Sequence, residues 1–153
     1  MGYRCCAFGN RNSSLKLCAD LREIVNDLIV NKKVDEFLTY GMGNFDKAFV
    51  SAVINARKIH KDIKLVLVVS GAMSCFKENQ EYYKNIYDRI IMPHSNGISD
   101  GRDSLLSLSN YLIKNCDYII SGVFGNTGKA YSAICFAKKS GKVIIPVNSK
   151  AIG

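Results

Sequence analysis

Four short glycine-containing stretches hold the residues of this sequence that are best suited to bind a ligand. They read FGNR at residues 8–11, GMGNFD at 41–46, SGAMSCF at 70–76 and SGVFGNTG at 121–128. Glycine lets a backbone approach a ligand closely and adopt positive φ angles, and the N–H groups at a helix start attract anions. Each stretch therefore suits a phosphate or a ribose, although any tight strand-to-helix turn can also need glycine.

Each stretch follows an apolar segment that we expect to be a β-strand. Strands are expected at residues 3–8, 37–40, 63–69, 89–92, 118–121 and 143–147. Segments with apolar residues at helical spacing lie between them, at residues 17–28, 45–56, 77–87, 105–115 and 127–139. This alternation predicts an α/β fold with a mainly parallel sheet and helices on both faces. We expect one Rossmann-like three-layer domain over residues 1–153.

A ligand site is expected at the carboxyl ends of the strands, where the loops of an open parallel sheet converge. Four glycine-containing loops at that end favour a binding site over four unrelated turns. The expected binding residues are Phe8, Gly9, Asn10, Arg11, Gly41, Met42, Gly43, Asn44, Asp46, Ser70, Gly71, Phe76, Glu78, Arg102, Ser121, Gly122, Gly125, Asn126, Thr127 and Gly128.

The charged and aromatic members of this set suggest specific contacts. Arg11 and Arg102 would make charge-assisted hydrogen bonds to an anion. Phe8 or Phe76 would stack on a base. Asn44 tolerates a left-handed backbone and could instead cap the second helix.

Catalytic groups are sparse near the expected site. Its only carboxylates are Asp46, Glu78, Asp100 and Asp103. An N-glycosidic hydrolase needs carboxylates to stabilise an oxocarbenium-like ribose or to activate water. Asp46 has a simpler role as a helix cap, and Glu78 as a favourable charge early in a helix. We therefore assign no catalytic residue. The sequence also lacks the motifs GxxxxGK[ST] and GxGxxG, which argues against a conventional ATPase or NAD dehydrogenase.

The positions of the cysteines and the net charge limit the kinds of ligand and partner that we expect. The six cysteines lie in or beside apolar segments without a CxxC pair, so reduced core thiols are expected, with no metal site and no cofactor. The formal charge of +8 would attract anions, either nucleotides or nucleic acid. No apolar run is long enough for a membrane span and no signal peptide is evident, so we expect a soluble cytoplasmic protein without a membrane partner.

The motifs, taken in order, resemble the YpsA/YoqJ-like branch of the SLOG superfamily. CCAFGNR at residues 5–11 is similar to the CCFTGHR opening of that branch, and GMGNFD is similar to its GALGFD. Residues 76–90 fall where members carry a Gln-containing segment, and residues 101–144 resemble the closing stretch with its Gly-Gly-Thr and basic helix. The resemblance implies a Rossmannoid fold that binds nucleotides or nucleotide-derived molecules, and a homo-oligomer (dimer or higher).

Departures from the family pattern weaken a hydrolase activity. Asn10 stands where the opening motif has His, Asn44 replaces a glycine, and Asn126 replaces the second glycine of Gly-Gly-Thr. Phosphoribohydrolases of the superfamily carry GGxGTxxE with a catalytic glutamate. When Gly125 is set on the first glycine of that pattern, Ser132 falls at the glutamate position.

Three functions follow from these observations. The first is binding of a nucleotide-derived small molecule (ADP-ribose-type, cyclic or mono-nucleotide), with sequestration of an immune signal by a phage or mobile-element sponge in the host cytoplasm as its role. The alternative is a nucleotide N-glycosidase. Single-stranded nucleic-acid binding is ranked last, because it needs aromatics interleaved with a basic groove, whereas Tyr83 and Tyr87 fit a buried helix face.

Overall fold

Six parallel strands form the sheet of the domain in a computed structural model. The structure describes residues 2–9, 17–40, 43–69, 80–92, 101–123 and 128–147. The side chains of residues 43, 80 and 101–107 are not described. The strands are β1 (Tyr3–Gly9), β2 (Val34–Thr39), β3 (Lys64–Val68), β4 (Arg89–Ile91), β5 (Tyr118–Gly122) and β6 (Val143–Pro146). The helices are α1 (Leu17–Lys32), α2 (Gly43–Ile59), α4 (Gln80–Ile86), α5 (Gly101–Asn115) and α6 (Lys129–Lys139). None of these helices combines the length and apolar character needed to cross a bilayer.

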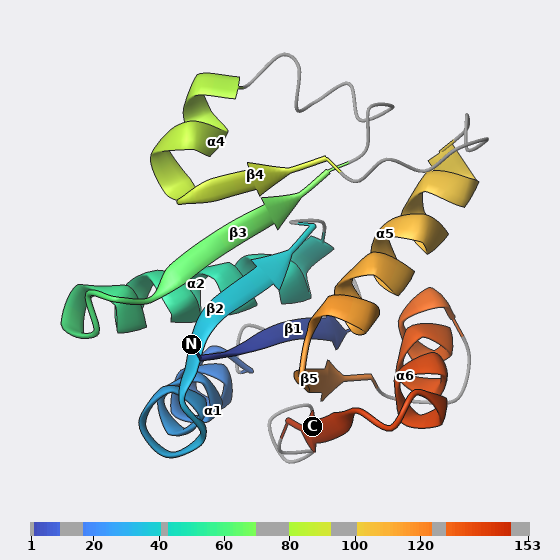
Figure 1. Ribbon diagram of the computed structural model, residues 1–153, viewed down its shortest axis with the longest axis horizontal. Coiled ribbons are helices and arrows are strands. Elements are labelled where there is room, and N and C mark those ends of the chain that lie inside the picture. Colours follow the sequence, from blue (N-terminus) through green and yellow to red (C-terminus); the bar gives the residue numbers. More distant parts are fainter. Residues whose placement is uncertain are drawn as a thin grey trace.

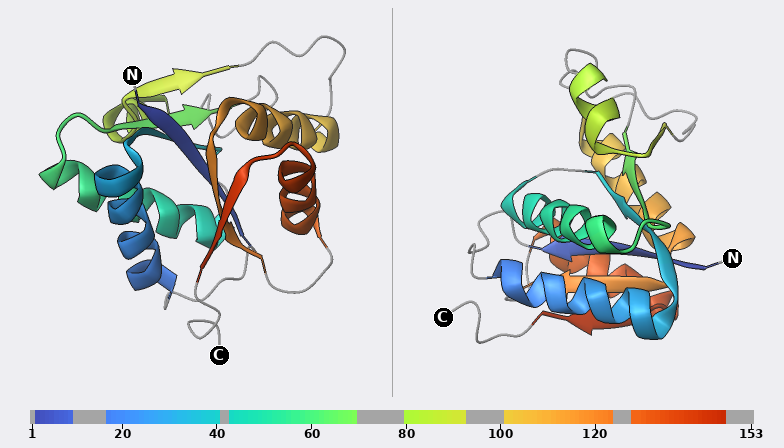
Figure 2. Two further views of the ribbon diagram at one scale, coloured as in Figure 1. Left: turned by 60° about the horizontal axis from the view of Figure 1, so that its bottom comes forward. Right: turned by 90° about the vertical axis from the view of Figure 1, so that its left-hand side faces the viewer.

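Helices cover both faces of the sheet, so the predicted three-layer α/β fold is confirmed (Figures 1 and 2). Successive side chains of a strand point to opposite faces. Cys5 and Ala7 of β1 accordingly lie in a core with α1, α2 and α4, whereas Cys6 and Phe8 lie in a second core with α5 and α6. The two cores hold the sheet between the helix layers.

The sheet has the order β4-β3-β2-β1-β5-β6, and this order places a switch point between β1 and β5. From β1 the chain adds β2, β3 and β4 on one side, and α5 then returns it to the other side of β1. Right-handed crossovers place the helices of the two halves on opposite faces. In sheets of this kind, loops diverge at the carboxyl ends of the two strands that flank the switch point, and ligands bind there.

The predicted elements are all present, but α5 begins at Gly101 rather than at residue 105, and one strand begins earlier than expected. β2 begins at Val34, which is buried, whereas the sequence pattern placed its start at residue 37. Asp35 and Glu36 obscured this start because they are polar. Asp35 accepts a hydrogen bond from the Gly2 N–H, and Glu36 pairs with arginines of neighbouring strands. The end of α6 is as predicted, since Gly141 follows it with φ 75°.

An ion pair fixes the edge strand β4 to the rest of the domain. Arg57 Nη1 of α2 lies 2.6 Å from Asp88 Oδ2, and Arg57 Nη2 donates to the Ile86 carbonyl at 3.1 Å. The same Asp88 oxygen accepts from the Leu65 N–H at 2.8 Å. These contacts join α2, β3 and the turn before β4, and they keep a three-residue strand in register.

The thiols of the central strand are enclosed by the two cores. Cys5 and Cys6 are fully buried, as expected for core thiols, whereas Cys18 and Cys135 are partly exposed. Burial, and secondarily the neighbouring Cys116, raises the pKa of both the Cys5 and the Cys6 thiol. A thiol that is both buried and protonated is a poor nucleophile.

We therefore expect Cys5 and Cys6 to resist alkylation in the native protein while Cys135 reacts. Iodoacetamide labelling at mildly alkaline pH, followed by peptide mass spectrometry, measures this. Denatured protein is the control, and all these cysteines should label in it. Rapid native labelling of Cys5 or Cys6 would show that the sheet is not enclosed as described.

Candidate functional site

An aromatic ring lies across the carboxyl ends of the two strands at the switch point. Gly9 of β1 and Gly122 of β5 are register partners. A Cβ atom would lie 2.2 Å from Phe45 Cγ if built at Gly9, and 2.2 Å from Phe45 Cε1 if built at Gly122. Phe45, in the first turn of α2, is 1% exposed. Glycine at both positions is therefore required by Phe45, whether or not a ligand binds beside them.

Because the Phe45 ring packs on these glycines, the start of α2 lies at the switch point together with the polar residues of its first turn. Gly43 begins the helix and Asn44 is exposed, while Asp46 is buried with 4% of its surface exposed. The prediction that Asn44 or Asp46 caps α2 is wrong, because both lie inside its first turn. Burial chiefly, and after it the neighbouring Cys116, raises the pKa of the Cys6 thiol, and the Asp46 charge makes a smaller contribution in the same direction.

The start of α6 differs from the starts of the other helices. Asp20, Asp46 and Glu81 lie in the first turns of α1, α2 and α4, where a negative charge offsets the helix dipole. The first turn of α6 has no acidic residue, and it begins with the exposed Lys129. Residues 118–153 contain no Asp or Glu. The positive end of this helix dipole is therefore reinforced rather than neutralised.

Gly128 shapes this helix start. Its φ of 102° and ψ of 172° suit only glycine, and a Cβ there would meet nothing within 4 Å. No side chain of the described residues caps the helix. The Gly128 carbonyl accepts from the Ser132 N–H and from Ser132 Oγ, both at 3.1 Å. The N–H groups in the first turn of a helix have no partner within the helix, and such groups form anion sites at helix starts.

The described members of the predicted binding set lie at this end of the sheet, but the side chain of one of them, Phe8, is enclosed in the core. Gly9, Gly43, Asn44, Asp46, Ser121, Gly122 and Gly128 lie at the ends of β1 and β5 or in the helix starts that follow the strands. Phe8 is 2% exposed and packs 6.3 Å from the Tyr40 ring centroid. Its predicted stacking on a base is wrong, because its ring belongs to the core.

For the other predicted residues, either the side chain or the whole residue lies outside what the structure describes. Arg102 lies in the first turn of α5. Those outside the described residues are Asn10, Arg11, Gly41, Met42, Ser70, Gly71, Phe76, Glu78, Gly125, Asn126 and Thr127. Lys129 was not among the predicted site residues. Its position could have indicated it, because Lys129 directly follows a glycine-rich stretch in a segment without acidic residues.

Comparison with solved structures finds this fold in DNA processing protein A. The Streptococcus pneumoniae protein superposes with a TM-score of 0.69 at 11% identity, over 99% of this chain and 53% of that one. A Helicobacter pylori structure, which describes a single-stranded DNA binding mode, gives 0.67 at 16% identity over 95% and 65%. The chain thus spans between half and two thirds of these proteins. No family model and no curated protein matches the sequence.

These comparisons contradict the order of functions drawn from the sequence. Sequestration of a nucleotide-derived small molecule was ranked first, and nucleic acid was ranked last as a partner. The Helicobacter pylori protein of the same fold binds single-stranded DNA, and neither neighbour supports a nucleotide sponge. The comparison shows a shared Rossmann-like fold, and it does not support the YpsA/YoqJ-like branch.

The contact between Phe45 and the two glycines predicts a steric coupling. Gly9→Ala should lower the free energy of unfolding by about 1–3 kcal/mol, because a methyl group would overlap the ring. Urea unfolding measures this loss. In Phe45→Leu protein the same substitution should cost clearly less, since the smaller side chain leaves room. A Gly9→Ala cost that is equal in both backgrounds would contradict the described packing.

Proposed function

We propose that this domain binds single-stranded nucleic acid, single-stranded DNA above all, across the carboxyl ends of β1 and β5. The observation that carries the proposal is the acid-free start of α6 with Lys129, beside the switch point of a fold that a single-stranded-DNA-binding protein shares. The formal charge of +8 adds a long-range attraction for a polyanion.

The proposed contacts are chiefly to phosphates. N–H groups of the first turn of α6 would donate to one phosphate, and the Lys129 ammonium would pair with it or with its neighbour. An interaction of this type reads no base, so the affinity should be similar for different sequences. It should also fall steeply with salt, since each neutralised phosphate releases condensed counterions.

The segments that follow β1, β2, β3 and β5 in the sequence would extend this surface. By their place in the sequence, Arg11 and the stretch Gly125–Thr127 follow the two strands at the switch point, and we propose that they contact the same strand of nucleic acid. No chemical step is proposed. The single domain over residues 1–153 and the homo-oligomer stay predictions.

Binding is tested by fluorescence anisotropy with a labelled oligo-dT at low salt. Lys129→Glu should weaken binding about tenfold or more, because it places a like charge beside a bound phosphate. Lys58→Glu is the matched control. Lys58 is exposed in the last turn of α2, at the opposite end of the sheet. It should change affinity only through the overall charge, by a factor of about two.

Two results would contradict the proposal. One is the absence of oligo-dT binding by the wild-type protein at low salt. The other is an equal loss from Lys129→Glu and Lys58→Glu, since it would show that only net charge matters. A preference for duplex over single-stranded DNA would count against the single-strand assignment.

A further inference from the structure

A row of charged side chains crosses the sheet far from the switch point. Arg4, Glu36 and Lys64 are register partners on β1, β2 and β3. Arg89 of β4 is aligned with Val66, the second residue after Lys64. We call Arg4, Glu36, Lys64 and Arg89 the arginine shelf. It combines three cations with one carboxylate near the amino ends of the strands.

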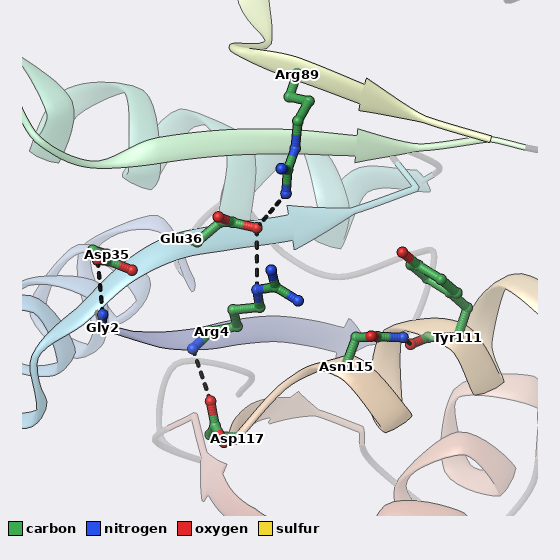
Figure 3. A network of polar contacts seen from close by, with 8 residues as sticks. All are labelled: Gly2, Arg4, Asp35, Glu36, Arg89, Tyr111, Asn115 and Asp117. Atoms are coloured by element: carbon green, nitrogen blue, oxygen red, sulfur yellow. Dashed lines mark hydrogen bonds and ion pairs between the residues drawn. The ribbon is translucent and has the colours of Figure 1, made fainter. Parts of the chain in front are cut away.

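The carboxylate organises the two guanidinium groups. Glu36 Oε1 lies 2.7 Å from Arg89 Nη2 and 3.2 Å from Arg4 Nε, and Figure 3 shows Arg89 reaching across β3 to it. The side chain of Glu36 is 18% exposed, whereas those of Arg4 and Arg89 are 42% and 52% exposed. Solvent therefore meets mainly the cations, which are held in place before any partner arrives and lose less freedom on binding.

The shelf lies on an open part of the sheet. It belongs to the face that α5 and α6 cover near β1, β5 and β6. Figure 1 shows that, among the described elements, these helices do not extend over the amino halves of β3 and β4. Three more carboxylates lie on these strands or just before them: Asp35 and Asp117 accept from the Gly2 and Arg4 N–H groups, and Asp88 pairs with Arg57. Within the shelf itself, three cations share one carboxylate. The accessible side chains of the shelf thus carry surplus positive charge.

An aromatic side chain lies on the same face of the sheet as the shelf. Tyr111 of α5 is partly exposed, and Figure 3 shows its ring on the side of α5 next to β1 and β2. The helix end that carries it is tied by Asn115 Nδ2, which donates to the Tyr111 carbonyl at 2.8 Å. An aromatic ring and clustered arginines on one face are a combination that binds single-stranded nucleic acid, through base stacking and phosphate pairing.

We propose that the arginine shelf is a second contact surface for the phosphates of a single strand, a proposal that rests on the function proposed above. An acidic protein would meet the cations equally well, but it would gain less from the partly exposed tyrosine on the same face. Arg4 and Gly9 are five residues apart on β1, or about 17 Å along the strand. A single-stranded nucleic acid bound at the switch point therefore needs several more nucleotides to reach the shelf.

Oligonucleotide length separates the two surfaces. The probes are oligo-dT of about 6 nucleotides, near the lower end of the usual range of single-strand site sizes, and of about 20 nucleotides, above that range. Arg4→Gln with Arg89→Gln should weaken binding of the long probe about tenfold and lower its salt slope by about 1.4, the value for two lost phosphate contacts. Binding of the short probe should change by less than a factor of about two.

The controls keep the comparison specific. Lys58→Gln with Lys32→Gln removes the same charge from exposed helix ends and should affect neither probe differently from the other. Arg89→Lys keeps the charge and should retain much of the affinity for the long probe. Thermal unfolding confirms that the variants fold, which is expected because exposed ion pairs add little to stability.

Each outcome decides the matter. Unchanged binding of the long probe, or an equal loss for both probes, would overturn the second surface while leaving the binding site at the switch point intact. Wild-type protein that binds neither probe would instead overturn the proposed function and the shelf with it. Loss of binding to poly-glutamate without loss of oligo-dT binding would assign the shelf to an acidic protein.

Discussion

The packing of the Phe45 ring on Gly9 and Gly122 is the constraint from which the rest of the site follows. Full burial of a phenylalanine contributes about 1.5–3 kcal/mol, and here it is possible only because two register partners on adjacent strands both lack a side chain. The ring holds the first turn of α2 against the ends of β1 and β5. It thereby closes the core at the carboxyl ends of these two strands.

Charge is distributed along the strands in a way that suits a polyanion. Asp35, Asp88 and Asp117 accept hydrogen bonds from backbone N–H groups of Gly2, Leu65 and Arg4, so they join neighbouring strands near their amino ends. Acidic residues also lie in the first turns of the helices of the first half, but not in that of α6. Cations are therefore left accessible both at the start of α6 and on the arginine shelf.

The sequence predicted the fold well because apolar periodicity is local. It missed the start of β2 because Asp35 and Glu36 interrupt the apolar pattern, and it could not show that Gly9 and Gly122 face one ring. The arginine shelf could not be predicted from the sequence, because its residues come from four strands and are brought together only by the register of those strands. The order of functions was wrong for a chemical reason: glycine loops and helix starts that suit a nucleotide phosphate also suit the phosphate of a nucleic acid.

The most direct test of the central claim is hydrogen–deuterium exchange of the protein with and without a saturating oligo-dT. The account predicts slower exchange of the amides at Lys129, Ala130 and Tyr131 when the oligonucleotide is bound, because these N–H groups would donate to a phosphate. The last turn of α2, at the opposite end of the sheet, should exchange at an unchanged rate. Binding without any protection at the start of α6 would contradict the account.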